Sequence, residues 1–121
     1  MFVGVLKRAI ETAEKSTYHP FRVGAVIFKG NKIFAEGRNS IRCCRNLKKK
    51  NWNSVHAEQH AILNMGETKC KGLSMLVIRL NLSDNIRLAK PCDMCQDLIK
   101  QVGIKRVFYS NGDGTILKME L

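Results

Sequence analysis

Acidic side chains are scarce in this sequence. Its 121 residues include 10 Asp and Glu against 21 Lys and Arg, which gives a formal net charge of +11. No acid occurs between Glu36 and Glu58. A field of this sign attracts polyanions and speeds their association. The alternative explanation is a generally lysine-rich surface that has no polyanionic partner.

Long apolar runs are missing as well. No stretch approaches the roughly 20 apolar residues of a membrane-spanning helix. The apolar run at residues 2–6 is short and lacks the preceding basic residues of a signal peptide. The five cysteines are an odd number and include the adjacent pair Cys43 and Cys44, a poor framework for disulfides. We therefore expect a protein of the reducing cytoplasm or nucleus without a membrane partner.

The apolar content is sufficient for one core. Hydrophobic residues make up 45% of the chain and charged residues 26%, as in globular proteins. A chain of this length buries roughly two-thirds of its unfolded surface. We expect a single domain over residues 1–121.

Hydrophobic spacing predicts the order of the first elements. Residues 2–15 carry apolar side chains at intervals of three and four, which predicts an amphipathic helix against one face of a sheet. Strands are expected over residues 21–28 and 33–38, joined across the hairpin pair Gly30-Asn31. The nearly continuous apolar run at residues 73–80 is typical of a central strand buried on both faces.

Two further strands are expected near the end of the sequence. They cover residues 104–109 and 115–119, and the turn-forming residues 111–114 between them indicate an antiparallel pair. The earlier of the two strands follows a predicted helix, so it should pair in parallel with the strand before that helix.

The segment between residues 38 and 52 is basic and irregular. It ends at the only tryptophan and leads directly into His56. Cations beside an exposed aromatic ring form a surface that stacks bases and binds phosphates of single-stranded nucleic acid. We expect such a surface to include Arg42, Arg45, Lys48, Lys49, Lys50, Trp52 and Arg87. A solvated charge run, with the tryptophan at the edge of the core, is the alternative.

The chemistry of the chain is concentrated in two strings, H-A-E at residues 56–58 and P-C-D-M-C at residues 91–95. The thiols at positions i and i+3 lie on the same face of one helical turn. One imidazole nitrogen and two thiolates are three zinc ligands, the number found in catalytic sites that leave a fourth position for water. We expect His56, Cys92 and Cys95 to bind Zn²⁺, and Glu58 to act on the proton of that water.

Each string is expected to open a helix. Residues i and i+2 diverge by about 200° on a regular helix, so His56 and Glu58 can share a site only in the first turn. That helix is expected over residues 55–64, with Ser54 as its N-cap. The second helix is expected over residues 92–102, and its N-terminus should favour thiolate over thiol at both cysteines.

Other uses of the same residues remain open. The two cysteines could form a redox pair, although such a motif normally follows a first strand and needs no H-x-E. His56 and His60 stand at i and i+4, but the intervening glutamate is one position late for a zinc-protease helix. A closed structural zinc site with His60 or another cysteine as fourth ligand is a third alternative.

Together the strings match the H-x-E and P-C-x-x-C signature of zinc-dependent nucleobase deaminases. The chain resembles the cytidine deaminase-like superfamily over nearly its whole length. The resemblance implies a three-layer α/β/α fold with a mixed five-stranded sheet. It also implies that Val23 and Ala25 belong to the pocket floor, that Asn39 hydrogen-bonds the sugar, and that the backbone at Ala57 holds the base carbonyl. The alternatives are a turn-forming role for Asn39 and a close-packing role for Gly24.

The chain departs from that family before its second string. The family usually runs from the buried strand into Pro-Cys within a few residues, whereas residues 81–90 are inserted here. We expect a turn at residues 83–85 and a short returning strand that brings Arg87 and Lys90 near the pocket rim. The antiparallel last pair resembles the free-nucleoside deaminases, because the branches that act on tRNA and polynucleotides usually place a helix there.

By resemblance, the function is zinc-dependent hydrolytic deamination of cytosine to uracil. We expect single-stranded nucleic acid as the substrate, because +11 exceeds what one phosphate needs. Free cytidine, deoxycytidine or their monophosphates are the alternative, and a non-catalytic zinc-stabilised nucleic-acid binder is another. Adenine as the target base stays open. Many relatives are dimers or larger, so a homo-oligomer is one alternative, and the sequence leaves the oligomeric state open.

Three cysteines lie outside the two strings, at residues 43, 44 and 70. We expect free structural thiols. The alternative, by resemblance to some deoxycytidylate deaminases, is a second metal site made by Cys70 and one of the adjacent pair.

Overall fold

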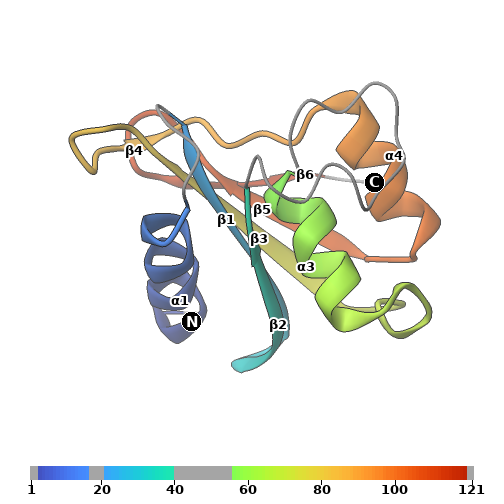
Figure 1. Cartoon of the computed structure of the whole chain (residues 1–121). Coiled ribbons are helices and arrows are strands. Elements are labelled where there is room, and N and C mark those ends of the chain that lie inside the picture. Colours follow the sequence, from blue (N-terminus) through green and yellow to red (C-terminus); the bar gives the residue numbers. More distant parts are fainter. Residues whose placement is uncertain (1–2, 17–20, 40–55, 120–121) are drawn as a thin grey trace.

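A computed structural model describes residues 3–16, 21–39 and 56–119 of the chain (Figure 1). The elements are α1 (Val3–Glu14), β1 (Arg22–Lys29), β2 (Lys32–Arg38), α3 (Ala57–Met65), a short 3₁₀ helix η1 (Glu67–Lys69), β3 (Ser74–Leu80), β4 (Ile86–Arg87), α4 (Asp93–Gln101), β5 (Arg106–Ser110) and β6 (Ile116–Met119). None of the helices in these ranges is long and apolar enough to cross a bilayer.

The strands of the described ranges form one mixed sheet. Its main path runs β2-β1-β3-β5-β6, and the short strand β4 pairs with the end of β3. The pair β3–β5 is parallel because α4 connects the two strands as a crossover. The other neighbours are antiparallel, including the last pair, β5–β6. The expected mixed sheet of five strands is confirmed, with β4 as a sixth, two-residue strand.

Helices cover both faces of this sheet and give the expected three layers. Helix α1 lies on one face, and α3 and α4 lie on the other (Figure 1). Strand β3 contributes to both interfaces, since Met75 and Val77 join the core under α3 and α4 while Leu76 and Ile78 join the core under α1. All four side chains are fully buried. Each such burial contributes about 1.5–3 kcal/mol relative to exposure, which explains the unbroken apolar run.

The turns around the sheet follow the sequence signals. Strands β1 and β2 close a hairpin between Lys29 and Lys32, with Gly30 at φ 62°. The inserted segment turns at Asp84, which adopts φ 63°, and returns as β4. The expected returning strand is therefore confirmed, and it places residues 88–90 between the end of the sheet and the start of α4.

Some expected features fall outside the described residues. They are Cys43, Cys44 and the basic surface formed by Arg42, Arg45, Lys48, Lys49, Lys50 and Trp52. Cys70 lies within the described ranges, where it is a free, fully buried thiol in the core under α3 and α4. Its Sγ donates to the carbonyl oxygen of Gly66 at 3.4 Å.

Two glycines allow helices to lie directly on the sheet. A Cβ at Gly24 of β1 would lie 2.5 Å from the backbone nitrogen of Ala13 in α1. A Cβ at Gly37 of β2 would lie 2.2 Å from the backbone nitrogen of Ala61 in α3. Backbone atoms cannot move aside as the end of a flexible side chain can, so a Cβ at either position would displace the helix. The close-packing alternative for Gly24 is therefore confirmed, and Gly37 sets how closely α3 approaches the sheet.

Replacing Gly37 by alanine should destabilise the protein by about 1–3 kcal/mol, because the added methyl group displaces α3 from the sheet. Urea denaturation of G37A and the wild type would measure the difference. The matched control is G4A in α1, where an added Cβ meets nothing within 4 Å. Equal stability of G37A and G4A would show that the contact at Gly37 relaxes without cost.

Candidate active site

The starts of two helices supply the metal-ligating side chains. His56 is the N-cap of α3, and Cys92 is the N-cap of α4. Helix α3 therefore begins at Ala57, later than expected, and the N-cap assigned to Ser54 is wrong because His56 occupies that position. The expectation that His56 and Glu58 meet only in the first turn agrees with this geometry, since Glu58 is the second helical residue.

His56, Cys92 and Cys95 form a group that could hold a metal ion. Their donor atoms all lie within 4.8 Å of one another. His56 Nδ1 is 3.7 Å from Cys92 Sγ and 3.4 Å from Cys95 Sγ. A tetrahedral zinc ion, bound at about 2.1 Å to nitrogen and about 2.3 Å to sulfur, keeps such donors roughly 3.6 Å apart. The donor set and its spacing therefore fit zinc.

The two thiols differ in their surroundings. Cys92 is exposed, whereas Cys95 is fully buried. Burial raises the pKa of Cys95 well above the usual thiol range, and the charges of Glu58 and Cys92 add to the shift. The expectation that the helix N-terminus lowers the pKa is thus wrong for Cys95, because burial outweighs it. A divalent cation reverses this balance, since a coordinating thiol is deprotonated outright.

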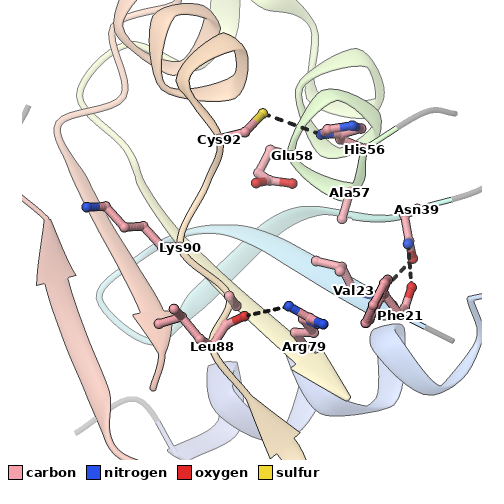
Figure 2. A pocket seen from close by; sticks show the side chains of 11 residues that line it. Phe21, Val23, Asn39, His56, Ala57, Glu58, Arg79, Leu88, Lys90 and Cys92 are labelled. Atoms are coloured by element: carbon pink, nitrogen blue, oxygen red, sulfur yellow. Dashed lines mark hydrogen bonds between the residues drawn. The ribbon is translucent and has the colours of Figure 1, made fainter. Parts of the chain in front are cut away.

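Glu58 combines deep burial with access to the site. Its exposed fraction is 5%, and burial raises the pKa of its carboxyl to about 7. Figure 2 shows this carboxyl beside the Cys92–His56 pair and facing the cavity. A carboxyl group with a pKa near neutrality can both accept and return a proton at physiological pH. Its position and environment therefore suit general acid–base chemistry.

The residues next to Glu58 hold the start of α3 in place. Gln59, also buried, accepts a hydrogen bond from the backbone N–H of His56 at 3.2 Å through its Oε1. His60 Nδ1 accepts a hydrogen bond from the backbone N–H of Arg38 at 3.0 Å, so this nitrogen links α3 to β2. His60 lies outside the candidate metal group. Sequence reasoning missed Gln59, although a glutamine three residues after an N-cap is half of a capping box.

A cavity of about 270 Å³ opens in front of the metal group. This volume lies just below the roughly 300–1,000 Å³ typical of ligand pockets. Its lining is Phe21, Val23, Asn39, His56, Ala57, Glu58, Arg79, Leu88, Ala89, Lys90 and Cys92. Of the expected pocket residues, Val23, Asn39 and Ala57 line this cavity. Ala25 is fully buried in the core and is not part of the lining.

Asn39 is tied to the strand that forms the cavity floor. Its Oδ1 accepts hydrogen bonds from the backbone N–H of Val23 at 2.9 Å and from Ser16 Oγ. Its Nδ2 donates to the carbonyl oxygen of Phe21 at 2.6 Å. An amide nitrogen has two donor hydrogens, so one more donor can serve a ligand. Asn39 thus has both a structural role and a place in the cavity wall.

Sequence reasoning did not anticipate the wall opposite the metal group. Phe21, Arg79 and Leu88 line it, and the Arg79 guanidinium lies 4.0 Å from the centre of the Phe21 ring. The available signal was an arginine within the apolar run of β3. Lys90 lines the cavity as expected, whereas Arg87 is exposed and is not among the lining residues.

The chain is similar in structure to known deaminases. It matches cytidine deaminase from Burkholderia pseudomallei with a TM-score of 0.66 and 18% identity, covering 99% of this chain and 92% of that one. It matches dCMP deaminase from the cyanophage S-TIM5, in complex with dCMP and dUMP, with a TM-score of 0.58 and 23% identity over 93% and 85% of the two chains. At these identities the likeness shows the fold.

A third solved structure is more similar in sequence but much longer. It is the diaminohydroxyphosphoribosylaminopyrimidine deaminase/5-amino-6-(5-phosphoribosylamino)uracil reductase of Thermotoga maritima, with 30% identity and a TM-score of 0.57. The match covers 88% of this chain and 28% of that one. No match was found among curated protein sequences.

A family model covers most of the chain. Residues 4–111 match the zinc-binding region of cytidine and deoxycytidylate deaminases. This match includes α1, the sheet through β5, and both strings that supply the candidate ligands. The cofactor of such a domain is zinc, in agreement with the donor set. The chain therefore belongs to the family of zinc-dependent cytidine and deoxycytidylate deaminases.

Proposed function

We propose that this protein hydrolyses the exocyclic amino group of a cytosine base, giving uracil and ammonia. The observation that carries the proposal is the position of Glu58, a buried carboxyl that faces both the group His56, Cys92 and Cys95 and the cavity. A purely structural zinc site has no use for such a carboxyl. This argues against the alternative of a non-catalytic zinc-stabilised nucleic-acid binder.

His56, Cys92 and Cys95 are the residues that would hold the zinc ion. Zinc bound to three protein ligands supplies a water molecule with a pKa near neutrality. Glu58 would accept one proton from that water and deliver it to N3 of the base. The oxygen of that water would bond to C4, and Glu58 would then carry the remaining proton of this oxygen to the amino nitrogen, so that the bond from C4 to the nitrogen breaks and ammonia leaves. One water is consumed for each ammonia released.

Other residues would position the base. Ala57, the first residue of α3, lines the cavity next to Glu58, and its backbone would hold the base carbonyl. Val23 and Asn39 form the adjoining wall, where the remaining donor hydrogen of Asn39 can meet the sugar. The cavity size favours one nucleotide unit at a time.

A free cytosine nucleoside or nucleotide is the substrate class that the described residues favour. The cavity is small, and the sheet ends in an antiparallel β5–β6 pair, the arrangement expected of deaminases that act on free nucleosides. The expectation of a single-stranded polynucleotide rested on residues 42–52, outside the described ranges, and on the net charge of +11. That charge keeps the polynucleotide as a second candidate.

Replacing Glu58 by glutamine should lower kcat by about 10²–10⁴-fold, the usual contribution of general acid–base catalysis. Zinc content should stay near that of the wild type, because Glu58 is not in the ligand group. Ammonia release and metal analysis would measure the two effects. The control is E67Q in η1, an exposed carboxylate away from the cavity. Wild-type turnover by E58Q would exclude the proton-transfer role.

Replacing Cys92 by alanine should weaken zinc binding by more than about 100-fold. Mutation of a residue that only hydrogen-bonds to a metal ligand already lowers metal affinity by about 10–100-fold, and loss of a ligand should cost more. Cys92 is exposed, so its loss removes little packing. Adding a chelator should therefore lower the melting temperature of the wild type but leave that of C92A unchanged. Undiminished zinc binding by C92A would refute the proposed ligand set.

Uracil formation should be faster on free cytosine nucleosides or nucleotides than on a single-stranded oligonucleotide that contains cytosine. Initial rates on each substrate, followed by chromatography, would decide between the two classes. A polynucleotide substrate would reveal itself by a steep loss of affinity as salt is raised, because its binding releases counterions.

A further inference from the structure

Arg79 occupies a position of β3 that faces the core. Side chains alternate along a strand, and Met75 and Val77 point into the core under α3 and α4. Arg79 is the next residue on that face, paired across the sheet with Val23 of the cavity floor. A cation at such a position is costly unless it is paired. Local rules of this kind are broken most often at functional sites.

The contacts of Arg79 hold its guanidinium without neutralising it. The group lies on the Phe21 ring, 4.0 Å from its centre, and Nη1 donates to the carbonyl oxygen of Leu88 at 3.4 Å. Its Nε is buried, and it has no hydrogen-bond partner in the described part of the chain. Within the described residues no carboxylate forms an ion pair with Arg79. The side chain is therefore oriented by neutral partners and keeps its full charge.

Arg22 shows the contrasting arrangement on the same sheet. Its Nε is also buried and finds no partner within the described ranges, but its Nη2 donates to the carbonyl oxygen of Asn81 at 2.7 Å and forms an ion pair with Asp84. Among the residues that the structure describes, a carboxylate thus pairs with the arginine outside the cavity and none pairs with the arginine inside it. The missing anion at Arg79 is one that a ligand can provide.

Two other cations lie near Arg79. Strand β4 places Arg87 directly opposite Arg79, and like charges in opposed positions destabilise a strand pair. Lys90 lies at the rim, with its ammonium directed away from the cavity centre (Figure 2). Of the described residues that line the cavity, Glu58 is the one acid, and it lies at the metal end. An anion at Arg79 would relieve this excess of positive charge.

The cavity therefore has two chemically different ends. Glu58, His56 and Cys92 lie at one end, and Arg79 and Leu88 lie at the other, as Figure 2 shows. A cytosine base with its C4 at the metal end directs its sugar substituents away from that end. We propose that Arg79 binds the phosphate of a cytosine nucleoside monophosphate and so makes the nucleotide, rather than the nucleoside, the preferred substrate. This inference rests on the proposed deaminase function.

Arginine suits this role better than lysine would. Its planar fork can make two parallel hydrogen bonds to phosphate oxygens, and such charge-assisted pairs are about twice as strong as neutral ones. The Phe21 ring orients the guanidinium of Arg79 before the ligand binds, which reduces the conformational entropy lost on binding. A contact with a part of the substrate that does not react should act mainly on KM.

The test compares deoxycytidine with its 5′-monophosphate, using zinc-loaded full-length protein. The wild type should prefer the monophosphate in kcat/KM by about 100-fold, the scale of roughly two strong charged contacts. R79Q should lower kcat/KM for the monophosphate by about 30–100-fold, mainly through KM, and that for deoxycytidine by less than about 3-fold. R79K should fall between the two, because it keeps the charge without the fork.

The matched control is R106Q. Arg106 is exposed at the start of β5, paired with Ser74 at the opposite end of β3, so its loss removes the same charge away from the cavity. R106Q should behave as the wild type on both substrates. Metal analysis and thermal unfolding of R79Q would show whether this variant is folded and contains zinc. If R79Q does not fold, the same comparison of the two substrates with R79K tests the phosphate contact.

Several outcomes separate this inference from the proposed function. Equal kcat/KM for both substrates, or equal losses for both in R79Q, would overturn the phosphate contact while deamination stands. Faster turnover of a single-stranded oligonucleotide than of the monophosphate would overturn it in favour of a polynucleotide. If nothing is deaminated, the proposed function fails, and binding of deoxyuridine monophosphate against deoxyuridine decides the inference. If the wild type binds deoxyuridine monophosphate more tightly than deoxyuridine, and R79Q removes this difference, the phosphate contact is supported. Equal binding of the two by the wild type overturns it.

Discussion

Helices α3 and α4 begin at the same place above the sheet, and the proposed chemistry depends on that convergence. The parallel β3–β5 pair requires α4 as a crossover, and this connection brings Cys92 back over the end of β3. Helix α3 reaches the same region because Gly37 lets it lie against β2. Side chains at a helix start point past its end, so His56, Cys92 and Cys95 meet without distorting either helix.

Features with local signals could be predicted from the sequence. The hairpin at Gly30, the doubly buried strand β3 and the return through β4 each follow from turn residues or apolar spacing within a short window. The candidate ligands and Glu58 were found because their spacing is itself informative. Their assembly into one site required the further knowledge that such strings occur together in a family of known fold.

Features that depend on packing between distant segments could not be predicted. Arg79 and Phe21 become neighbours only when β1 pairs with β3, so neither residue indicates a cavity wall by itself. The shifted pKa of Cys95 is a consequence of burial, which overrides the helix-terminus effect read from its position. Ala25, expected in the pocket floor, points to the same face of β1 as Val23, but it lies two residues further along the strand, in the core under α3 and α4, and only Val23 lines the cavity.

Residues 87–89, which run from the end of β4 along the cavity wall, are hydrogen-bonded to the end of β5. The backbone N–H of Ala89 donates to the carbonyl oxygen of Ser110 at 2.9 Å, and Ser110 Oγ donates to that of Arg87 at 2.7 Å. These bonds fasten one cavity wall to β5 rather than to α3. A change in the length or charge of this wall would therefore alter the Leu88 side of the cavity without displacing α3, which carries Glu58.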